Sequence, residues 1–190
     1  GEAGMREVNV PVLTEREDLP SVSSILHERL NVAPRHVAFG RTIDGEIVDV
    51  TTAEFYREVR SIALGLLAAG VKQSDRVVIM SPTRYEWSVA SFAIWEAGAV
   101  VVPVYDTASV SQTKTILDEC GVRFAFARGP EESRVISKAS PDCRVWSFDS
   151  GLPDDLSDLV SMGKVAPTNE AELDRRTGRV TADDLASIVF

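Results

Sequence analysis

The hydrophobic positions divide the chain into a short amino-terminal part and a longer part in which helices and strands alternate. In the amino-terminal part, apolar residues at helical spacing predict a short amphipathic helix at residues 21–31. Strands at residues 37–41 and 46–50 flank Asp44-Gly45, a dipeptide that favours a hairpin because both residues tolerate positive φ. A helix and a β-hairpin are therefore expected before the rest of the fold.

Three helix starts carry a hydroxyl residue followed three positions later by Glu or Gln. This capping-box pattern predicts that the residue pairs satisfy each other's backbone N–H groups at Thr51 and Glu54, Thr83 and Glu86, and Ser109 and Gln112. The apolar face of the first helix is the clearest in the chain, and glycine ends it. The three helices are expected to end at Gly70, at Gly98 and near Glu119.

Short apolar runs separate these helices and predict strands. They lie at residues 77–80, 99–104, 122–126 and 144–148, with a further helix near 131–139. Strands that alternate with helices at this spacing indicate a parallel sheet with right-handed crossovers. The predicted fold class is therefore α/β, with a mainly parallel sheet and flanking helices.

The pattern weakens after residue 148. Residues 149–169 are rich in Asp, Ser, Gly and Pro, and only three apolar residues hint at a short helix, so the segment is interpreted as a long surface excursion. Residues 170–176 predict one or two charged helical turns, and 183–190 a helical turn that runs into an apolar strand.

Composition narrows the function without identifying it. The chain of 190 residues has a formal net charge of −9, and its basic residues are scattered, which argues against nucleic-acid binding. No apolar stretch is long enough to cross a bilayer.

Cys120 and Cys143 lack metal-ligand spacing and are expected to be reduced thiols of a cytoplasmic protein. Residues 1–4 resemble a remnant of recombinant expression ahead of a native start at Met5.

Three stretches in order resemble the signatures of adenylate-forming enzymes. They are ALGLLAAGVKQSDRVVI within residues 56–79, SPTRYEW at 81–87 and AGAVVVPVYDT at 97–107, the last two in the versions of bacterial long-chain fatty-acid CoA ligases. The resemblance covers about residues 19–190. Ser74 departs from it, because the family usually has Gly before the Asp-Arg pair; we expect a changed turn and an unchanged function.

The resemblance implies an AMP-forming acyl-CoA synthetase. Such enzymes join a fatty acid to AMP from ATP, release pyrophosphate and pass the acyl group to coenzyme A, with ATP, Mg²⁺ and CoA as the cofactors of the full-length enzyme. The family's phosphate loop follows a strand that residues 186–190 resemble. Residues 5–190 would thus be the amino-terminal subdomain of the adenylation domain, ending before that loop, inactive alone and with no bound cofactor. No catalytic residue and no metal ligand can be placed. Acyl chain length, the acceptor, the oligomeric state and peripheral membrane association stay open.

Several polar and aromatic side chains follow predicted strands, on the side of a parallel sheet where ligands collect. The candidate substrate-binding residues are Ser81, Thr83, Arg84, Trp87, Tyr105, Asp106 and Thr107. Several have a structural alternative: a helix cap for Thr83, an Asx-type turn for Asp106 and Thr107, and core packing for Trp87. Arg84 could meet a coenzyme A phosphate or remain an exposed first-turn arginine. His27 is interpreted as solvated on the polar side of its helix.

Two other classes fit the alternation of helices and strands. A dinucleotide-binding dehydrogenase would carry G-x-G-x-x-G after its first sheet strand, and the residues after Met80 do not supply it. A free-standing flavodoxin-like or receiver-like binding module fits the pattern of elements. A receiver domain, however, typically has a pair of acidic residues after its first strand, and no acidic pair follows residues 77–80. This binding module stays the alternative to a ligase.

Overall fold

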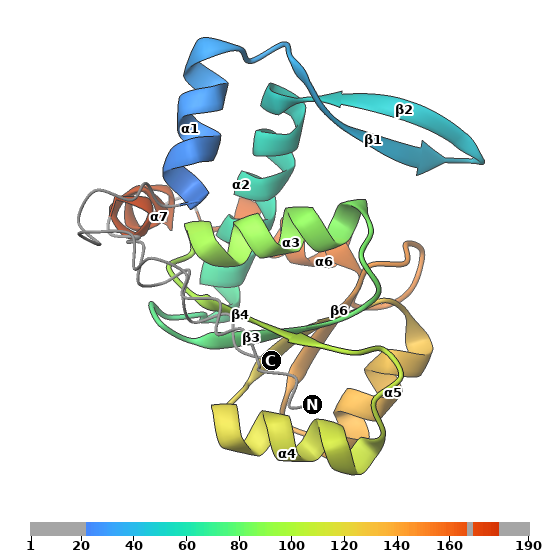
Figure 1. The fold of residues 1–190 in the computed structure, drawn as a ribbon. Coiled ribbons are helices and arrows are strands. Elements are labelled where there is room, and N and C mark those ends of the chain that lie inside the picture. Colours follow the sequence, from blue (N-terminus) through green and yellow to red (C-terminus); the bar gives the residue numbers. More distant parts are fainter. Residues whose placement is uncertain (1–21, 167–168, 179–190) are drawn as a thin grey trace, which may run out of the picture.

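The chain folds around a four-stranded parallel sheet that carries helices on both faces and a separate β-hairpin (Figure 1). The structure is a computed structural model that describes residues 22–166 and 169–178. The predicted strand within residues 183–190 and the segment 1–4 lie outside the described residues. The expected α/β class, with a helix and a hairpin before a parallel sheet, is confirmed.

The amino-terminal part forms as its sequence pattern predicts. Helix α1 spans Val22–Val32, and strands β1 (Val37–Ile43) and β2 (Glu46–Thr51) pair in antiparallel orientation. The turn between the strands has φ of 51° at Asp44 and 80° at Gly45. These left-handed values match the twist of the flanking strands and explain the choice of this dipeptide.

Helix α2 (Thr52–Ala69) begins and ends at the predicted residues. The Thr51 hydroxyl accepts a hydrogen bond from the Glu54 N–H at 3.2 Å and also donates to the Glu54 carboxylate at 2.9 Å. The cap is therefore confirmed, although the glutamate binds the threonine side chain instead of its backbone N–H. Gly70 ends the helix with φ of 99°, in the left-handed region that glycine enters without steric cost.

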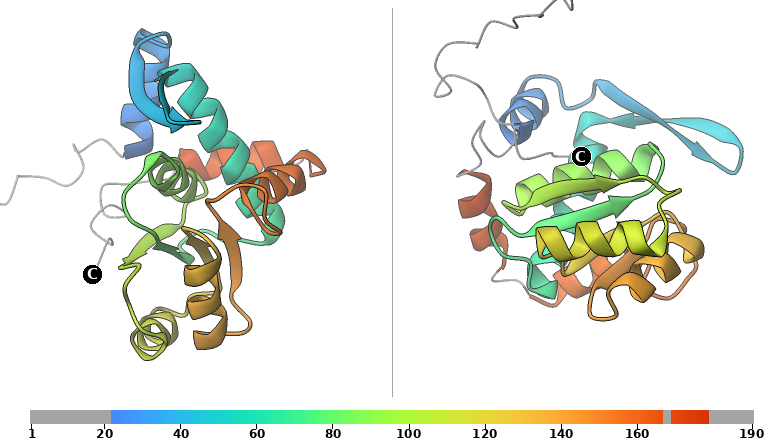
Figure 2. Two further views of the ribbon diagram at one scale, coloured as in Figure 1. Left: turned by 90° about the vertical axis from the view of Figure 1, so that its right-hand side faces the viewer. Right: turned by 60° about the horizontal axis from the view of Figure 1, so that its bottom comes forward.

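The sheet strands have the order β4-β3-β5-β6, and all three pairings are parallel. Their bounds are β3 Arg76–Met80, β4 Val100–Val104, β5 Phe124–Ala127 and β6 Arg144–Ser147. Helices α4 (Val110–Cys120) and α5 (Pro130–Ala139) cover one face, and α2, α3 (Tyr85–Glu96) and α6 (Leu156–Lys164) cover the other (Figures 1 and 2). Residues 77–80 are fully buried between the two layers, as their apolar run predicts.

Of the other two predicted capping boxes, one forms and one does not. The one that opens α4 is complete: the Ser109 hydroxyl accepts a hydrogen bond from the Gln112 N–H, and the Gln112 side chain accepts one from the Ser109 N–H. The one predicted at Thr83 is wrong. Arg84 is the cap residue of α3 and makes no side-chain cap bond, and Glu86 is occupied by ion pairs with two arginines. Charge pairing has displaced the local cap.

The long surface excursion predicted for residues 149–169 is wrong, although the short helix that its three apolar residues hinted at does form. Within it, Leu156–Lys164 form helix α6, which packs across α2 with Leu159 fully buried. The two helices cross closely because Gly65 of α2 and Gly163 of α6 lie against each other. A Cβ on Gly65 would lie 2.3 Å from the Leu159 carbonyl oxygen. Helix α7 (Asn169–Thr177) confirms the predicted charged turns and buries Leu173.

Ser74 adopts the conformation that glycine would favour. Its φ is 68°, and its N–H donates to the Gly98 carbonyl at 2.7 Å. Serine thus occupies the left-handed region here, at a cost of roughly 1–2 kcal/mol relative to glycine. The change of turn relative to the family stays a prediction.

Candidate functional site

A small cavity lies at the carboxyl ends of β3 and β4, where open parallel sheets bind their ligands. It measures about 270 Å³. The loops after both strands, the end of β4 and the first turn of α3 line it, with residues Ser81, Pro82, Thr83, Trp87, Pro103, Val104, Tyr105 and Asp106. We call it the strand-end cavity. The parallel register pairs Met80 with Val104, so the loops that follow them leave the sheet side by side.

The strand-end cavity brings together five of the seven candidate residues, namely Ser81, Thr83, Trp87, Tyr105 and Asp106. Ser81 is 8% exposed and donates to the Pro82 carbonyl at 2.8 Å, which fixes the start of the loop. Tyr105 is 83% exposed. A tyrosine so exposed beside a cavity offers an aromatic surface that the fold itself does not use.

The structural alternatives for Thr83 and Asp106 do not hold. Thr83 is not the cap residue of α3. The turn after β4 is closed by the backbone, because the Ala108 N–H donates to the Tyr105 carbonyl at 3.0 Å; an Asx-type turn would have used that N–H for the Asp106 carboxylate. Thr107 is exposed in the same turn and does not line the cavity. Trp87 is half-buried and packs against the core, as its alternative predicted.

Arg84 points away from the strand-end cavity. Its Nε donates to Glu86 at 2.8 Å, and its Nη1 donates to Asp149, in the loop between β6 and α6, at 2.9 Å. Both donors are therefore engaged within the fold, and the hydrogen bonds to these acids raise the pKa of the guanidinium against the opposing effect of desolvation.

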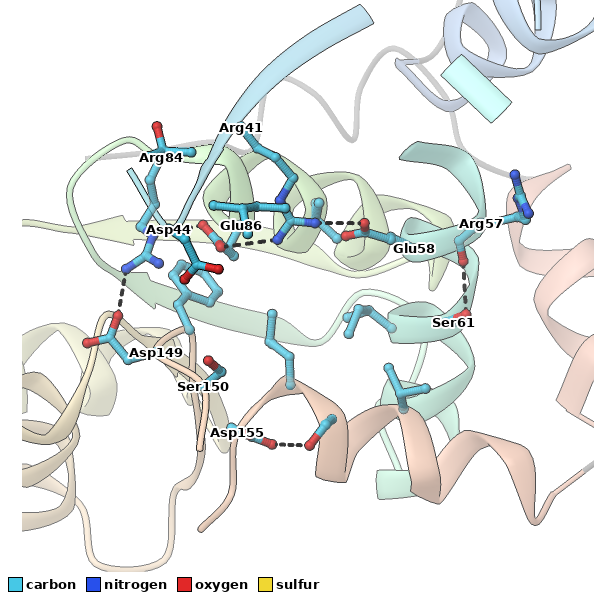
Figure 3. Close-up of a pocket in the computed structure, with 18 residues that line it drawn as sticks. Arg41, Asp44, Arg57, Glu58, Ser61, Arg84, Glu86, Asp149, Ser150 and Asp155 are labelled. Atoms are coloured by element: carbon cyan, nitrogen blue, oxygen red, sulfur yellow. Dashed lines mark hydrogen bonds and ion pairs between the residues drawn. The ribbon is translucent and has the colours of Figure 1, made fainter. Parts of the chain in front are cut away.

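A second, larger cleft of about 880 Å³ lies between the hairpin, α2, α3 and the loop before α6 (Figure 3). On its upper wall Arg41 of β1 reaches Glu58 of α2 at 3.0 Å and Glu86 of α3 at 3.6 Å, and its guanidinium lies 4.3 Å from the centre of the Tyr85 ring. Burial raises the pKa of both Glu58 and Tyr85. Sequence reasoning missed this cluster, because its members lie on separate elements and share no motif.

The ion pairs around this cleft form a chain. Glu86 forms ion pairs with both Arg41 and Arg84, and Arg84 in turn pairs with Asp149 (Figure 3). The chain links the hairpin, α3 and the loop before α6. Single exposed ion pairs stabilise a protein little, whereas a half-buried network also fixes geometry. The described residues contain no group of three or more His, Cys, Asp or Glu side chains that could hold a metal ion.

Both thiols are free in the structure, Cys143 buried and Cys120 half-buried. Burial raises the pKa of Cys143 to about 12, so its thiol is protonated and unreactive at neutral pH. We expect a thiol reagent at pH 8 to modify Cys120 and to reach Cys143 only after denaturation, with two thiols titrated in total. A total of none in unreduced, denatured protein would contradict the reduced state predicted for both.

Residues 26–190 match the AMP-binding enzyme family, over most of the chain. The chain belongs to this family. Among curated proteins it is 35% identical, over 98% of its length, to the long-chain-fatty-acid–CoA ligase FadD15 of Mycobacterium tuberculosis and to that of Mycobacterium bovis. The chain spans 31% of the length of each of these relatives. None of the helices in the described part of the chain has both the length and the apolar character needed to cross a membrane.

Solved structures show the same fold. The putative long-chain-fatty-acid CoA ligase of Rhodopseudomonas palustris superposes with a TM-score of 0.63 at 21% identity, over 74% of this chain and 36% of that one. O-succinylbenzoate coenzyme A synthetase (MenE) of Bacillus subtilis, in complex with ATP and magnesium ion, gives a TM-score of 0.58 at 21% identity, over 71% and 33%. At these identities the likeness concerns the fold alone.

Proposed function

We propose that these 190 residues form the amino-terminal part of an AMP-forming long-chain fatty-acid CoA ligase. The full-length protein would convert a fatty acid, ATP and CoA to acyl-CoA, AMP and pyrophosphate. The observation that carries this proposal is the 35% identity to FadD15, which extends over 98% of the chain and is not confined to a short motif.

The strand-end cavity is the part of that active site that we assign to the described residues. It lies at the carboxyl ends of two adjacent parallel strands, and the side chains of Thr83, Tyr105 and Asp106 around it are not used as helix caps or turn closures. Its size of about 270 Å³ suits part of a ligand, since whole ligand pockets measure about 300–1,000 Å³. We propose that the residues of this cavity contact the substrate and take no part in the chemical steps.

ATP, Mg²⁺ and CoA are the cofactors that the proposal requires. Support comes from family membership and from the MenE structure, which holds ATP and magnesium on the same fold. The described residues offer no metal-binding group, so Mg²⁺ would be held by ATP and by the remainder of the enzyme. We place the reaction in the cytoplasm, where fatty acid could be taken from solution or from a membrane surface.

The binding-module alternative is less well supported. It accounts for a parallel sheet with helices on both faces, but not for membership of the AMP-binding enzyme family. A module that acts by interaction alone would also leave the strand-end side chains without a role.

Pyrophosphate release tests the proposal. The full-length protein, incubated with ATP and Mg²⁺, is expected to release pyrophosphate when palmitate is added and to release much less with acetate, because a long apolar tail supplies binding energy that acetate lacks. The control is the same protein without acid. Pyrophosphate release that does not depend on any carboxylic acid would contradict the assignment, and a preference for acetate would contradict the long-chain specificity.

A further inference from the structure

A buried carboxylate at the end of α3 holds two helices that flank the core. Glu96 is 1% exposed. Its Oε1 lies 2.9 Å from the Nε2 of His27 on α1, and its Oε2 accepts a hydrogen bond from the Thr177 hydroxyl on α7 at 2.6 Å. The interpretation of His27 as a solvated residue is therefore incomplete: its side chain is half-buried and binds a buried acid 69 residues away.

The contacts with His27 and Thr177 are the main interactions that offset the cost of burying the Glu96 carboxylate. Within residues 22–166 and 169–178, no lysine or arginine forms an ion pair with it; Arg60, on the neighbouring helix, is paired with Asp174 at 3.0 Å instead. Tyr56 packs edge-on against His27, with the ring centres 5.0 Å apart, and its pKa is raised by burial and then by the charge of Glu96. A buried carboxylate that loses a hydrogen-bond donor must be solvated or must find another, at considerable cost.

Helix α7 is fixed on α3 at its last turn. Arg176 donates to the backbone carbonyl of Val71 at 2.7 Å and to that of Ala97 at 3.2 Å, and Thr177 reaches the Glu96 carboxylate. The chain therefore leaves α7 at a point set by the end of α3. In the proposed function, the approach to the ATP phosphate loop begins directly after this point.

We propose that Glu96 is a positioning residue that couples the docking of α1 to that of α7 and thereby sets the start of the segment leading to the phosphate loop. With His27 in place the carboxylate is held dry and aimed at Thr177. When α1 leaves, water reaches the carboxylate and competes with the Thr177 hydroxyl, so α7 loosens as well. The same reasoning predicts the reverse effect, because a coupling between two sites is reciprocal.

Hydrogen exchange of the 190-residue chain tests the coupling without any assay of activity. His27→Ala is expected to lower amide protection in α7 about tenfold, within the range of couplings between groups that share a partner, although His27 does not touch α7. Thr177→Val, which keeps the side-chain shape and removes the hydroxyl, is expected to lower protection in α1. Thr177→Ser, which keeps the hydroxyl, should restore it.

The matched control is Asp174→Asn, which breaks the ion pair between α2 and α7 and does not involve Glu96. It should loosen α7 directly but lower protection in α1 much less than Thr177→Val does, because the Thr177–Glu96 hydrogen bond is retained. If His27→Ala loosens α1 alone, or if Asp174→Asn loosens α1 as much as Thr177→Val does, the coupling through Glu96 is refuted.

The positioning role rests on the proposed function and has its own readout. In the full-length protein, Thr177→Val and His27→Ala are expected to raise the KM for ATP severalfold and to change kcat less, with Thr177→Ser close to wild type. An unchanged KM for ATP would overturn the positioning role. If the wild-type full-length protein turns over no ATP at all, the proposed function fails, whereas the exchange result still decides the coupling.

Discussion

Replacing Gly65 with alanine is expected to lower the free energy of unfolding by about 3 kcal/mol, the upper end of the usual cost of overpacking. The new Cβ would lie 2.3 Å from the Leu159 carbonyl oxygen and 2.7 Å from its Cγ. Because backbone cannot move aside as a flexible side chain can, α6 must shift away from α2 and expose part of the fully buried Leu159. Urea unfolding monitored by circular dichroism measures the change.

Ser161→Ala provides the control for this substitution. Ser161 is an exposed residue of α6 whose hydroxyl, among the described residues, donates to the carbonyl of Ser157 alone, so the variant should stay within about 0.5 kcal/mol of wild type. A loss at Gly65 no larger than that of the control would show that the two helices do not cross as closely as the structure has them.

The 190-residue chain is expected to release no pyrophosphate from ATP above a buffer blank, with or without palmitate. Adenylyl transfer depends on cations and backbone donors placed around the phosphates, and the described residues provide neither a metal-binding group nor a glycine-rich loop at the strand-end cavity. The difference from the full-length protein should reach several orders of magnitude. Acid-dependent turnover by the purified chain, free of host ligase, would contradict this prediction.

Most of the elements were predictable from sequence because they have a strong local signal. Apolar runs such as residues 77–80 indicate strands buried on both faces, and Asp44-Gly45 indicates a hairpin turn. The strand-end cavity was predictable for a similar reason: carboxyl ends of parallel strands meet at one edge of the sheet, so the loops after β3 and β4 had to adjoin.

The features that sequence reasoning missed all depend on contacts between distant segments. Nothing in the local pattern around Thr83 shows that Glu86 will pair with Arg41 of the hairpin. Helix α6 is short and lies in a segment rich in Asp, Ser, Gly and Pro, and its packing depends on Gly65, about a hundred residues earlier. Likewise, His27 occupies a polar helix position and still binds the buried Glu96. Tertiary pairing overrides local preference in each case.

The formation of a long-chain acyl-CoA thioester is the measurement that tests the account most directly. The full-length protein, given palmitate, ATP, Mg²⁺ and CoA, is expected to yield palmitoyl-CoA and AMP, identified by mass spectrometry, and to yield no thioester when ATP is left out. Accumulation of acyl-adenylate without thioester would contradict CoA as the acceptor. The absence of both products, with correctly folded protein, would contradict the proposal that this chain belongs to a fatty-acid CoA ligase.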